Sequence, residues 1–481
     1  MILKIENNSL ILTYFKKMEL SKFKHIIDII KTDIKNTEFD KHVFIVGGAV
    51  RNFLLGMEIN DIDICVDLPN GGIKFAEFIT KKHNSFKQGS NPVIFETYGT
   101  AKFNLHDSNI SDIDIEVVQT RKEQYKDPNS RNPSTEFGTI LEDAIRRDLT
   151  INALYLDISE RNIVDPTFSG LTDIQNKTIR TPSFPNITFH DDALRMLRVI
   201  RFATKLGWGI DKCTWFGICE NAYRINTISQ ERITDEINKI LLCDKPSIGI
   251  RRLLGCGLLK LVLPNVYEMI GIEQNKYHFG DVFEHTMCVL DSTLPILEHR
   301  LSALFHDVGK TVTKSIIDGK VHFYTHELKG CEMARDILKD MKYPNSIIDK
   351  VSTAIKYHMY FKNIQNPSNK TIRKFCDKVG NDNMDLCLDV IHADNISHQL
   401  EYCDYNQVPY IREQIKLDDK QTQIKPPING NDIMSKFNLK KGKYIGYLLD
   451  LIKEHLFENP NLSKEECFEI IEKEMYHENI V

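Results

Sequence analysis

The spacing of apolar residues divides the chain into two regions with different periods. From about residue 43 to 165, short β-rich runs alternate with helix-like pieces, which predicts a compact mixed α/β domain. Beyond about residue 190, apolar residues recur at threes and fours, as in ALRMLRVIRFATKL and ERITDEINKILL, nearly to the end of the chain. The pattern predicts an α+β fold: a small mixed-sheet head followed by a long all-α body.

Six β-rich runs predict the strands of the first region: VFIV, DIDICV, AKFNL, DIDIEVV, TINALYLDI and NIVD. Clusters of proline and polar residues at 126–134, 181–186 and 418–432 predict loops or linkers. The last cluster sets off a C-terminal piece.

Composition narrows the class of protein. A length of 481 residues suggests two to four domains, and 42% apolar with 27% charged residues is typical of folded globular proteins. No run approaches the roughly 18 to 20 apolar residues of a membrane helix, the N-terminus lacks the apolar core of a signal peptide, and the 11 cysteines include no CxxC pair. We therefore expect an intracellular, cytoplasmic protein, with a nuclear or organellar location left open.

The net charge of −5 means that polyanion binding needs local basic clusters.

Two carboxylates stand one residue apart in the run DIDICV. Strand side chains alternate between faces, so Asp61 and Asp63 point the same way while Ile62 and Ile64 face a core. A divalent cation would relieve the repulsion between the acids. A solvated strand face has the same pattern, so the pair alone leaves both interpretations open.

Glycines and further acids flank this pair. Gly47 and Gly48 follow the strand VFIV and precede a helix-like stretch, where free backbone N–H groups could cradle a triphosphate, although two glycines also suit a plain turn. Glu116, with Asp112 and Asp114, falls on one face of DIDIEVV. A third acid beside the pair would complete the ligands for two metal ions that orient a triphosphate and activate a hydroxyl.

Five segments in order resemble the CCA-adding tRNA nucleotidyltransferases and their poly(A) polymerase relatives: GGAVRN, DID, EDAIRRDLTINAL (142–154), DDALRMLRVIRF (191–202) and SQERI (229–233). The resemblance implies that Asp61 and Asp63 are catalytic carboxylates that bind Mg²⁺, with Glu116 as the third. It also implies these nucleotide-binding residues: Gly47, Gly48, Arg51, Arg146, Arg147, Asp148, Asn152, Asp192, Arg195 and Arg198. One departure is Asn52, where the family usually has Asp.

Two of these segments suggest how a nucleotide is held and chosen. The guanidiniums of Arg146 and Arg147 could contact triphosphate oxygens in forked pairs, or form a solvated edge. Asp192 and Arg195 are three apart and share a predicted helix face, which suits a plain ion pair. In the family the matching Asp and Arg meet the base edge, and such a site rejects UTP and GTP because a mismatch leaves buried polar groups unpaired.

The polar segment KEQYKDPNSRNPSTEFGT (122–139) reads as a linker. In the family this region is a flexible element tied to the switch from C to A addition.

Histidines and aspartates recur in the helical body. One alone suits a surface or core position, but adjacent His306 and Asp307 suit a divalent metal. The whole set resembles the HD phosphohydrolase domain, which implies a metal of unspecified identity and hydrolysis of phosphomonoesters or 2′,3′-cyclic phosphates. The implied ligands are His285, His306, Asp307 and Asp394 for one metal, with His326 and His358 for a second.

The C-terminal INGNDIMSKFNLKKGKYIGYLLDLIKE also resembles the family's tail. Its lysines form either a solvated face or a contact for the tRNA backbone. The candidate RNA-binding residues are Lys436, Lys440, Lys441 and Lys443, with Lys362, Lys370, Arg373 and Lys374 beside them.

These observations predict template-independent addition of C, C and A to tRNA 3′ ends from CTP and ATP by two-metal nucleotidyl transfer, with no membrane and no obligate protein partner. The predicted parts are a nucleotidyltransferase head (1–165), a helical nucleotide-recognition and RNA-binding neck (166–265), an HD domain (266–417) and a tRNA-binding tail (418–481). The alternatives are a poly(A) polymerase, an enzyme that adds only CC or only A, and an HD phosphohydrolase whose head only binds RNA.

Overall fold

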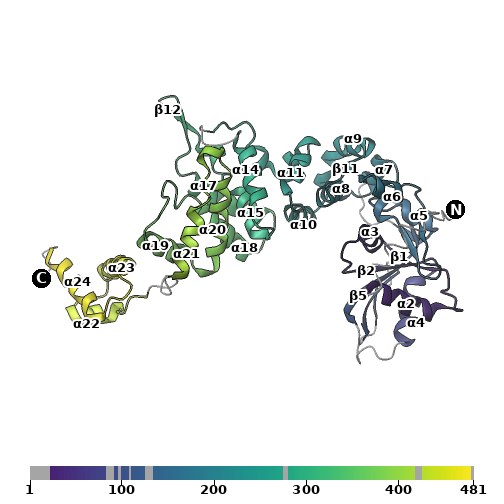
Figure 1. Ribbon diagram of the computed structural model, residues 1–481, viewed down its shortest axis with the longest axis horizontal. Helices are drawn as coiled ribbons and strands as arrows, with labels where there is room; N and C mark the ends of the chain where they lie inside the picture. Colours follow the sequence, from purple (N-terminus) through teal and green to yellow (C-terminus); the bar gives the residue numbers. More distant parts are fainter. Residues whose placement is uncertain are drawn as a thin grey trace. The chain divides into compact units, whose positions relative to one another are not determined.

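The computed structural model describes residues 22–82, 92–95, 99–107, 110–124, 134–274, 280–417 and 425–477. The described residues up to Ile240, together with Ile248–Val262, form one compact unit, and Leu241–Ser247 with the described residues from Leu263 onward form a second (Figure 1). The predicted fold class is confirmed: a mixed sheet lies in the N-terminal part and the remainder is helical.

The first unit holds the sheet and the helices that follow it. Its strands are β1 (Val43–Val46), β2 (Ile62–Val66), β3 (Val93–Phe95), β4 (Thr100–Asp107), β5 (Ile110–Gln119), β6 (Arg121–Gln124), β7 (Ser134–Phe137), β8 (Tyr155–Asp157), β9 (Ile163–Val164), β10 (Thr178–Ile179) and β11 (Gly209–Ile210). Its helices are α2 (Lys22–Ile34), α3 (Gly48–Leu55), α4 (Gly71–Lys82), α5 (Ile140–Ile145), η2 (Thr150–Asn152), α6 (Gly170–Gln175), α7 (Pro185–Asp191), α8 (Leu194–Leu206), α9 (Lys212–Asn221), η3 (Ala222–Thr227), α10 (Gln230–Leu241), α11 (Pro246–Gly255) and α12 (Leu259–Val262).

The seven-stranded sheet has the order β3-β4-β5-β2-β1-β8-β9. The pair β2 and β5 is parallel, and its neighbours in the sheet are antiparallel. All four residues of β1 are buried, as expected for a central strand with both faces covered.

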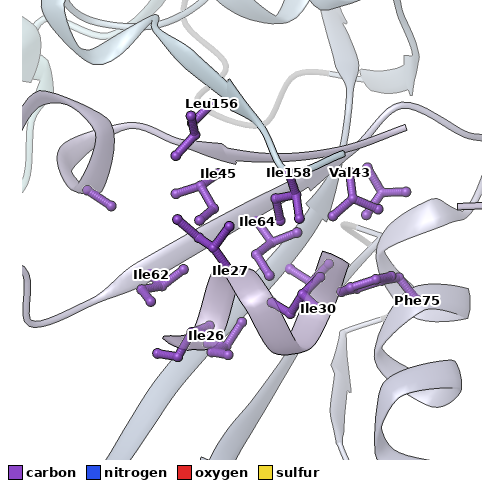
Figure 2. Packing of buried hydrophobic residues seen from close by; sticks show 14 of the residues in the cluster. Ile26, Ile27, Ile30, Val43, Ile45, Ile62, Ile64, Phe75, Leu156 and Ile158 are labelled. Atoms are coloured by element: carbon purple, nitrogen blue, oxygen red, sulfur yellow. The ribbon is translucent and has the colours of Figure 1, made fainter. Parts of the chain in front are cut away.

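Apolar residues of α2 and α4 cover one face of this sheet (Figure 2). Ile30 of α2, Phe75 of α4, and Ile45 and Ile64 of the central strands are almost completely buried there. Each such side chain contributes roughly 1.5–3 kcal/mol through burial. Because side chains alternate along a strand, fixing Ile64 on this face directs Asp63 to the opposite one.

Local hydrogen bonds change two predicted elements. The run TINALYLDI begins as the 3₁₀ turn η2 and not as a strand, because Asp148 accepts from the Leu149 backbone N–H and from the Asn152 side chain. The segment DDALRMLRVIRF is not one helix, since α7 ends at Asp191 and α8 begins at Leu194. Asp192 lies between them with an extended backbone.

Short strands also occur where the sequence suggested none. Strands β6 and β7 pair as an antiparallel hairpin inside the predicted 122–139 linker, of which residues 125–133 lie outside the described ranges. Strands β10 and β11 form a parallel pair within the region expected to be helical.

The second unit is helical apart from one small hairpin. Its elements are α13 (Pro264–Tyr267), α14 (Val282–Ser292), α15 (Leu297–Phe305), α16 (Lys310–Thr313), β12 (Ser315–Ile317), β13 (Lys320–His322), α17 (His326–Asp340), α18 (Asn345–Tyr357), α19 (Asn369–Val379), α20 (Asn381–Ile396), η4 (Leu400–Tyr402), α21 (Gln407–Leu417), α22 (Gly430–Phe437), α23 (Lys443–Glu458) and α24 (Lys464–His477). The last three helices have a hydrophobic core of their own. Within the described ranges no helix combines the length and apolar character that crossing a bilayer requires.

Candidate functional site

The sheet register brings the predicted catalytic acids together. Asp63 of β2 pairs with Glu116 of the parallel strand β5, and Asp61 directly precedes β2. All three acids are exposed, whereas the intervening Ile62 and Ile64 are buried. The predicted alternation along DIDICV is therefore present. Asp112 of β5 has no described side chain, and Asp114 is paired with Lys102 at 2.8 Å.

The charge around Asp63 is unbalanced. Loss of hydration, followed by the carboxylates of Glu116 and Asp61, raises the pKa of Asp63, and only the nearby Arg147 guanidinium acts against this. The acids do not converge as tightly as a preformed metal cage: among the described residues, the only groups with ligand atoms within 4.8 Å of one another lie in the second unit. The side chain of Asp63 is thus accessible, and a further positive charge beside it would stabilise its ionised form.

The two glycines lie against this acid. Gly47 has a φ of +71°, and a Cβ there would lie 3.4 Å from Asp63 Oδ2 and 3.6 Å from Arg147 Nη1. Helix α3 begins at Gly48, so its first N–H groups are available beside these side chains. The turn therefore joins backbone donors, a carboxylate and a guanidinium, which is a setting suited to phosphate oxygens.

A buried carboxylate organises the arginine pair. Asp143 accepts hydrogen bonds from Arg146 at 2.6 Å, from Arg147 at 3.0 Å and from the Tyr155 hydroxyl. Burial alone would raise its pKa, but Arg147, Arg146 and the Tyr155 hydroxyl hold the pKa at about 2. Asp143 is thus ionised and fixes the orientation of both guanidiniums.

The two arginines differ in what else they contact. Arg146 also pairs with Glu123 at 3.0 Å and donates to the Arg121 carbonyl at 3.2 Å. Arg147 directs Nη1 toward Gly47, and its guanidinium lies 5.3 Å from the Tyr155 ring centroid. Of the two, Arg147 is placed to contact a phosphate, whereas the guanidinium of Arg146 is already paired with neighbouring carboxylates.

A hydrogen-bonded chain connects the glycine helix to helix α8. Arg51 donates to Asn152 Oδ1 at 2.6 Å, Asn152 donates to Asp148 Oδ1 at 3.0 Å, and Arg198 donates to Asp148 Oδ2 at 2.8 Å. The chain continues through Glu236, which contacts Arg198 at 3.8 Å and Arg201 at 2.9 Å. Arg51, Asp148, Asn152 and Arg198 therefore form one polar network, most of it buried.

Asn52 belongs to the edge of this network. Its Oδ1 accepts from Arg51 Nη2 at 2.8 Å, and its Nδ2 donates to the Glu58 carbonyl at 2.8 Å. Burial, with Arg201 and Arg198 nearby, lowers the pKa of Arg51 to about 10 despite the charge of Asp148. The Asn52 amide accepts one hydrogen bond and donates another. A carboxylate could not do both, because it has no N–H group and its second oxygen would face the Glu58 carbonyl oxygen.

The residues predicted to read the base are joined by a backbone hydrogen bond, from the Arg195 N–H to the Asp192 carbonyl at 3.1 Å, but their side chains have other partners. Asp192 accepts from Arg232 at 2.7 Å and from the Leu194 N–H at 3.0 Å. Arg195 lies 3.9 Å from Asp191 and donates to the Thr188 carbonyl at 3.4 Å. The expectation that Asp192 and Arg195 share one helix face is wrong, because the chain breaks between α7 and α8 at Asp192.

Sequence reasoning missed four residues of this site: Asp143, Arg201, Arg232 and Glu236. Asp143 had a local signal, since it stands three and four residues before the arginine pair, the spacing at which side chains meet on a helix. Arg232 lay inside the SQERI segment without an assigned role. Arg201 and Glu236 join the network only through the tertiary fold, so their spacing in the sequence carried no signal.

The second cluster lies in the helical unit and resembles a metal centre. The Nδ1 atoms of His306, His326 and His358 each bond a backbone carbonyl, at 2.8, 2.8 and 2.6 Å. These contacts leave the Nε2 atoms to serve as ligands, as hydrogen bonds to the other ring nitrogen do in metal sites. His285 Nε2 lies 2.9 Å from Asp394 Oδ1, and His326 Nε2 lies 3.4 Å from Asp307 Oδ1.

Two groups of three ligand atoms have the spacing for a metal ion: His285, His306 and Asp307, and Asp307, His326 and His358. His306 Nε2 and Asp307 Oδ2 are buried without a hydrogen bond of good geometry, although they lie 3.1 Å apart. Buried polar atoms are rarely left in this state, so a shared cation fits the cluster. Burial and the neighbouring His326 and His306 lower the pKa of His358 to about 3, which keeps it neutral as a ligand requires.

Two lysines accompany the cluster. Lys310 Nζ lies 2.6 Å from Asp307 Oδ2, and Lys362 Nζ lies 3.1 Å from His398 Nε2. Both lysines line a cavity of about 220 Å³ together with Asp307, His326 and Asp394. The cavity thus combines candidate metal ligands with cations that suit a phosphate group.

The candidate RNA-binding lysines have different surroundings. Lys436, Lys440, Lys441 and Lys443 are all exposed on the C-terminal helices and their connecting turn. Lys370 and Lys374 pair with Glu458 and Glu454, and Arg373 is buried with its guanidinium on the Phe457 carbonyl. Lys370, Arg373 and Lys374 thus contact helix α23, whereas the tail lysines are exposed.

Comparison with known families agrees with this layout. Residues 43–180 match the poly A polymerase head domain, residues 207–269 the probable RNA and SrmB-binding site of polymerase A, and residues 282–397 the HD domain.

Known proteins match the chain over different lengths. A tRNA nucleotidyltransferase from Schizosaccharomyces pombe is 38% identical over 214 residues, which is 42% of this chain and 41% of that protein. The multifunctional CCA protein of Vibrio campbellii is 30% identical over 351 residues, 70% of this chain and 80% of that protein. The chain thus spans about two-fifths of the length of the fungal relative and most of the bacterial one.

The fold is also that of a solved enzyme. The crystal structure of the Bacillus stearothermophilus CCA-adding enzyme in complex with CTP superposes with a TM-score of 0.69 at 22% identity, covering 95% of this chain and 99% of that one.

Proposed function

Since the chain belongs to the family of CCA-adding tRNA nucleotidyltransferases with an HD domain, we propose that it adds C, C and A to tRNA 3′ ends from CTP and ATP. The observation that supports this most is the register of Asp63 with Glu116 on parallel strands, beside the glycine turn that faces Arg147. Acids for metal ions next to donors for phosphate are what nucleotidyl transfer requires.

The carboxylates of Asp61, Asp63 and Glu116 would hold divalent cations, which we propose to be Mg²⁺. Oxygen ligands suit this hard cation, and a bound cation would offset the loss of hydration and the carboxylate repulsion that raise the pKa of Asp63. When bound, the cations orient the triphosphate and activate the tRNA 3′ hydroxyl. The hydroxyl loses its proton to water, and its oxygen forms a bond to the α-phosphorus as the bond to pyrophosphate breaks. The N–H groups at the start of α3 and the guanidinium of Arg147 would hold the phosphate oxygens.

Asp192 and Arg195 would meet the edge of the base. In this structure Asp192 is bonded to Arg232 and Arg195 is near Asp191, so a bound nucleotide would replace these contacts by its own. Cytosine and adenine each offer an amino donor and a ring-nitrogen acceptor, which suit one carboxylate and one guanidinium. A base with the opposite pattern would leave both side chains unpaired at a cost of about 1–3 kcal/mol per group.

Extension of a tRNA that ends before CCA tests this function. We expect the wild-type chain with Mg²⁺, CTP and ATP to extend the tRNA, and the variants Asp61→Asn and Asp63→Asn to lose more than about 100-fold in rate. Glu77→Gln is a matched control, because it removes an exposed acid from helix α4. Equal rates for Asp63→Asn and wild type would overturn the proposal. The alternative of a poly(A) polymerase is not favoured, since the full-length relatives are named for CCA or CC addition.

We also propose that the HD cluster hydrolyses phosphomonoesters or 2′,3′-cyclic phosphates. The two groups of buried ligand atoms, and the His306 Nε2 atom that makes no hydrogen bond, favour this second activity. The six candidate ligands would hold one or two divalent metals, which when bound activate a water molecule. The water oxygen bonds to phosphorus, the ester P–O bond breaks, and the released oxygen takes up a proton. Lys310 and Lys362 would neutralise the phosphate oxygens.

The variant His306→Ala separates the two activities. We expect it to abolish metal-dependent hydrolysis of a 2′,3′-cyclic phosphate and to leave nucleotide addition at the wild-type rate, since the acids that would carry addition lie in the other unit. Hydrolysis that persists in His306→Ala would argue against the HD site.

We further propose that the head (1–165), neck (166–265), HD domain (266–417) and tail (418–481) act as separate functional parts. The exposed lysines of the tail, Lys436, Lys440, Lys441 and Lys443, would hold the tRNA backbone while its end reaches the acids.

A further inference from the structure

We propose that the HD cavity carries a stacking platform for a nucleobase, formed by His322 and Tyr324, so that its substrate is a nucleotide or an RNA 3′ end and not a base-free phosphoester. This inference rests on the proposed hydrolytic function of the HD site, and it adds the part of the substrate that the metal ligands do not recognise.

The platform consists of two parallel rings. The ring centroids of His322 and Tyr324 are 5.1 Å apart and their planes differ by 8°. Both residues line the cavity of about 220 Å³ that contains Asp307, His326 and Asp394. Tyr324 is 63% exposed, so one of its faces remains available at the solvent edge of the cavity. Stacked, exposed aromatic rings of this kind bind bases through their π faces.

The backbone fixes the platform next to the metal ligands. His322 ends strand β13, where it pairs with Ser315 of β12, and the Ser315 hydroxyl donates to the His322 carbonyl at 3.3 Å. The backbone carbonyl of the next residue, Phe323, accepts a hydrogen bond from His326 Nδ1 at 2.8 Å. The segment that carries the rings is therefore tied directly to a candidate metal ligand, and its position relative to the cluster is set by the fold.

Two cations line the same cavity as the platform and the cluster. Lys310 lies 5.4 Å from the Phe323 ring centroid and is held by Gln274 at 2.7 Å, while Lys362 belongs to the turn after α18. A phosphate at the metal ligands would contact these lysines, and a ribose would bridge to the rings. The cavity thus combines candidate metal ligands, phosphate donors and a flat aromatic surface, which match the parts of one nucleotide.

The platform offers stacking without hydrogen-bond partners specific to one base. Stacking on an aromatic side chain tolerates any base and typically changes affinity by about 5- to 100-fold. We therefore expect weak base preference combined with strong preference for a base over none.

Binding to the full-length, metal-loaded chain tests the inference by calorimetry, with adenosine 3′-monophosphate and inorganic phosphate as probes. We expect Tyr324→Ala to weaken nucleotide binding by about tenfold or more and to leave phosphate binding unchanged. Tyr324→Phe keeps the ring and should keep the affinity. Ile316→Ala, which shortens an exposed residue of the same hairpin, controls for a general disturbance.

The outcomes separate the inference from the hydrolytic function. Nucleotide binding that equals phosphate binding, or that is unchanged in Tyr324→Ala, would overturn the platform. A tenfold loss in Tyr324→Ala without any hydrolysis by the wild type would keep the platform and reject hydrolysis. Equal losses for nucleotide and phosphate in Tyr324→Ala would show a structural role and also overturn it.

Discussion

Replacing Asp143 with Asn removes the charge that orients both arginines of the head. The carboxylate is completely buried and is shared by Arg146, Arg147 and Tyr155. Asn keeps the shape but places an amide NH₂ against a guanidinium. Arg146 retains its pair with Glu123, whereas the ion pairs of Arg147 in the described chain are with Asp143 alone. Arg147 should therefore lose its orientation toward the glycine turn.

The pKa of Asp143 gives the size of the effect. Its pKa falls from an ordinary 3.8 to about 2 in the folded chain. This shift corresponds to about 2 kcal/mol of stabilisation from ionisation. Removing one partner of a buried ion pair costs about 3–5 kcal/mol, and since Glu123 still neutralises Arg146 we expect the lower end, about 3 kcal/mol at neutral pH.

Tryptophan fluorescence measures this loss selectively. The chain has two tryptophans, Trp208 and Trp215, and both lie in the first unit, so their signal during urea unfolding reports that unit. Because the folded pKa is lowered, the stabilisation is present above the ordinary value of 3.8 and is lost as the pH falls toward about 2. The difference between wild type and variant should stay constant down to about pH 4 and shrink by about 2 kcal/mol below it.

Glu142→Gln is the matched control, since it removes an exposed charge from the same helix and keeps a side chain that suits the capping box. It should behave as wild type. A loss below about 1 kcal/mol in Asp143→Asn, or a difference that does not shrink in acid, would refute the assignment of Asp143 as the charged anchor. An unchanged rate of CMP addition by Asp143→Asn would refute the claim that Asp143 orients Arg147.

Three further predictions follow from the same geometry. Arg195→Lys replaces a planar fork by a single ammonium and should increase misincorporation of UMP by about tenfold, measured by extension with each nucleotide alone; unchanged selectivity would count against Arg195 as the base reader. Protons compete with cations at Asp63, whose pKa is raised, so added Mg²⁺ should move the acid limb of the addition rate to lower pH; a limb independent of Mg²⁺ would contradict the metal role. Replacing Lys440, Lys441 and Lys443 together by Ala should raise the KM for tRNA and reduce the salt slope by about 2–3, while the KM for CTP stays the same; a change in both KM values would argue for a folding defect.

The sequence predicted those parts of the fold that depend on local periodicity. The alternation in DIDICV predicted the exposed Asp61 and Asp63 and the buried Ile62 and Ile64, because a strand with one covered face requires it. The helical period after residue 190 likewise predicted the all-α body. Family resemblance added the HD cluster, whose candidate ligands come from helices α14, α17 and α20 and from the residues that follow α15 and α18.

The remaining features depend on partners that periodicity does not encode. The break at Asp192 is stabilised by its bond to the Leu194 N–H and by Arg232, forty positions away. Lysines 370 and 374 looked like candidates for RNA contact, but Glu458 and Glu454 of α23 pair with them. The irregular Asn52 is explained by the Glu58 carbonyl, which only the structure places beside it.

The identity of the added nucleotides tests the central claim most directly. The full-length chain is incubated with Mg²⁺, all four nucleoside triphosphates and a tRNA that ends before CCA, and the 3′ ends of the products are sequenced. The proposed roles of Asp192 and Arg195 as base readers, and of Asp61, Asp63 and Glu116 as one set of catalytic acids, predict products that end in CCA and grow no further. A tail of repeated A, a stop after CC, or ends containing U or G would contradict it.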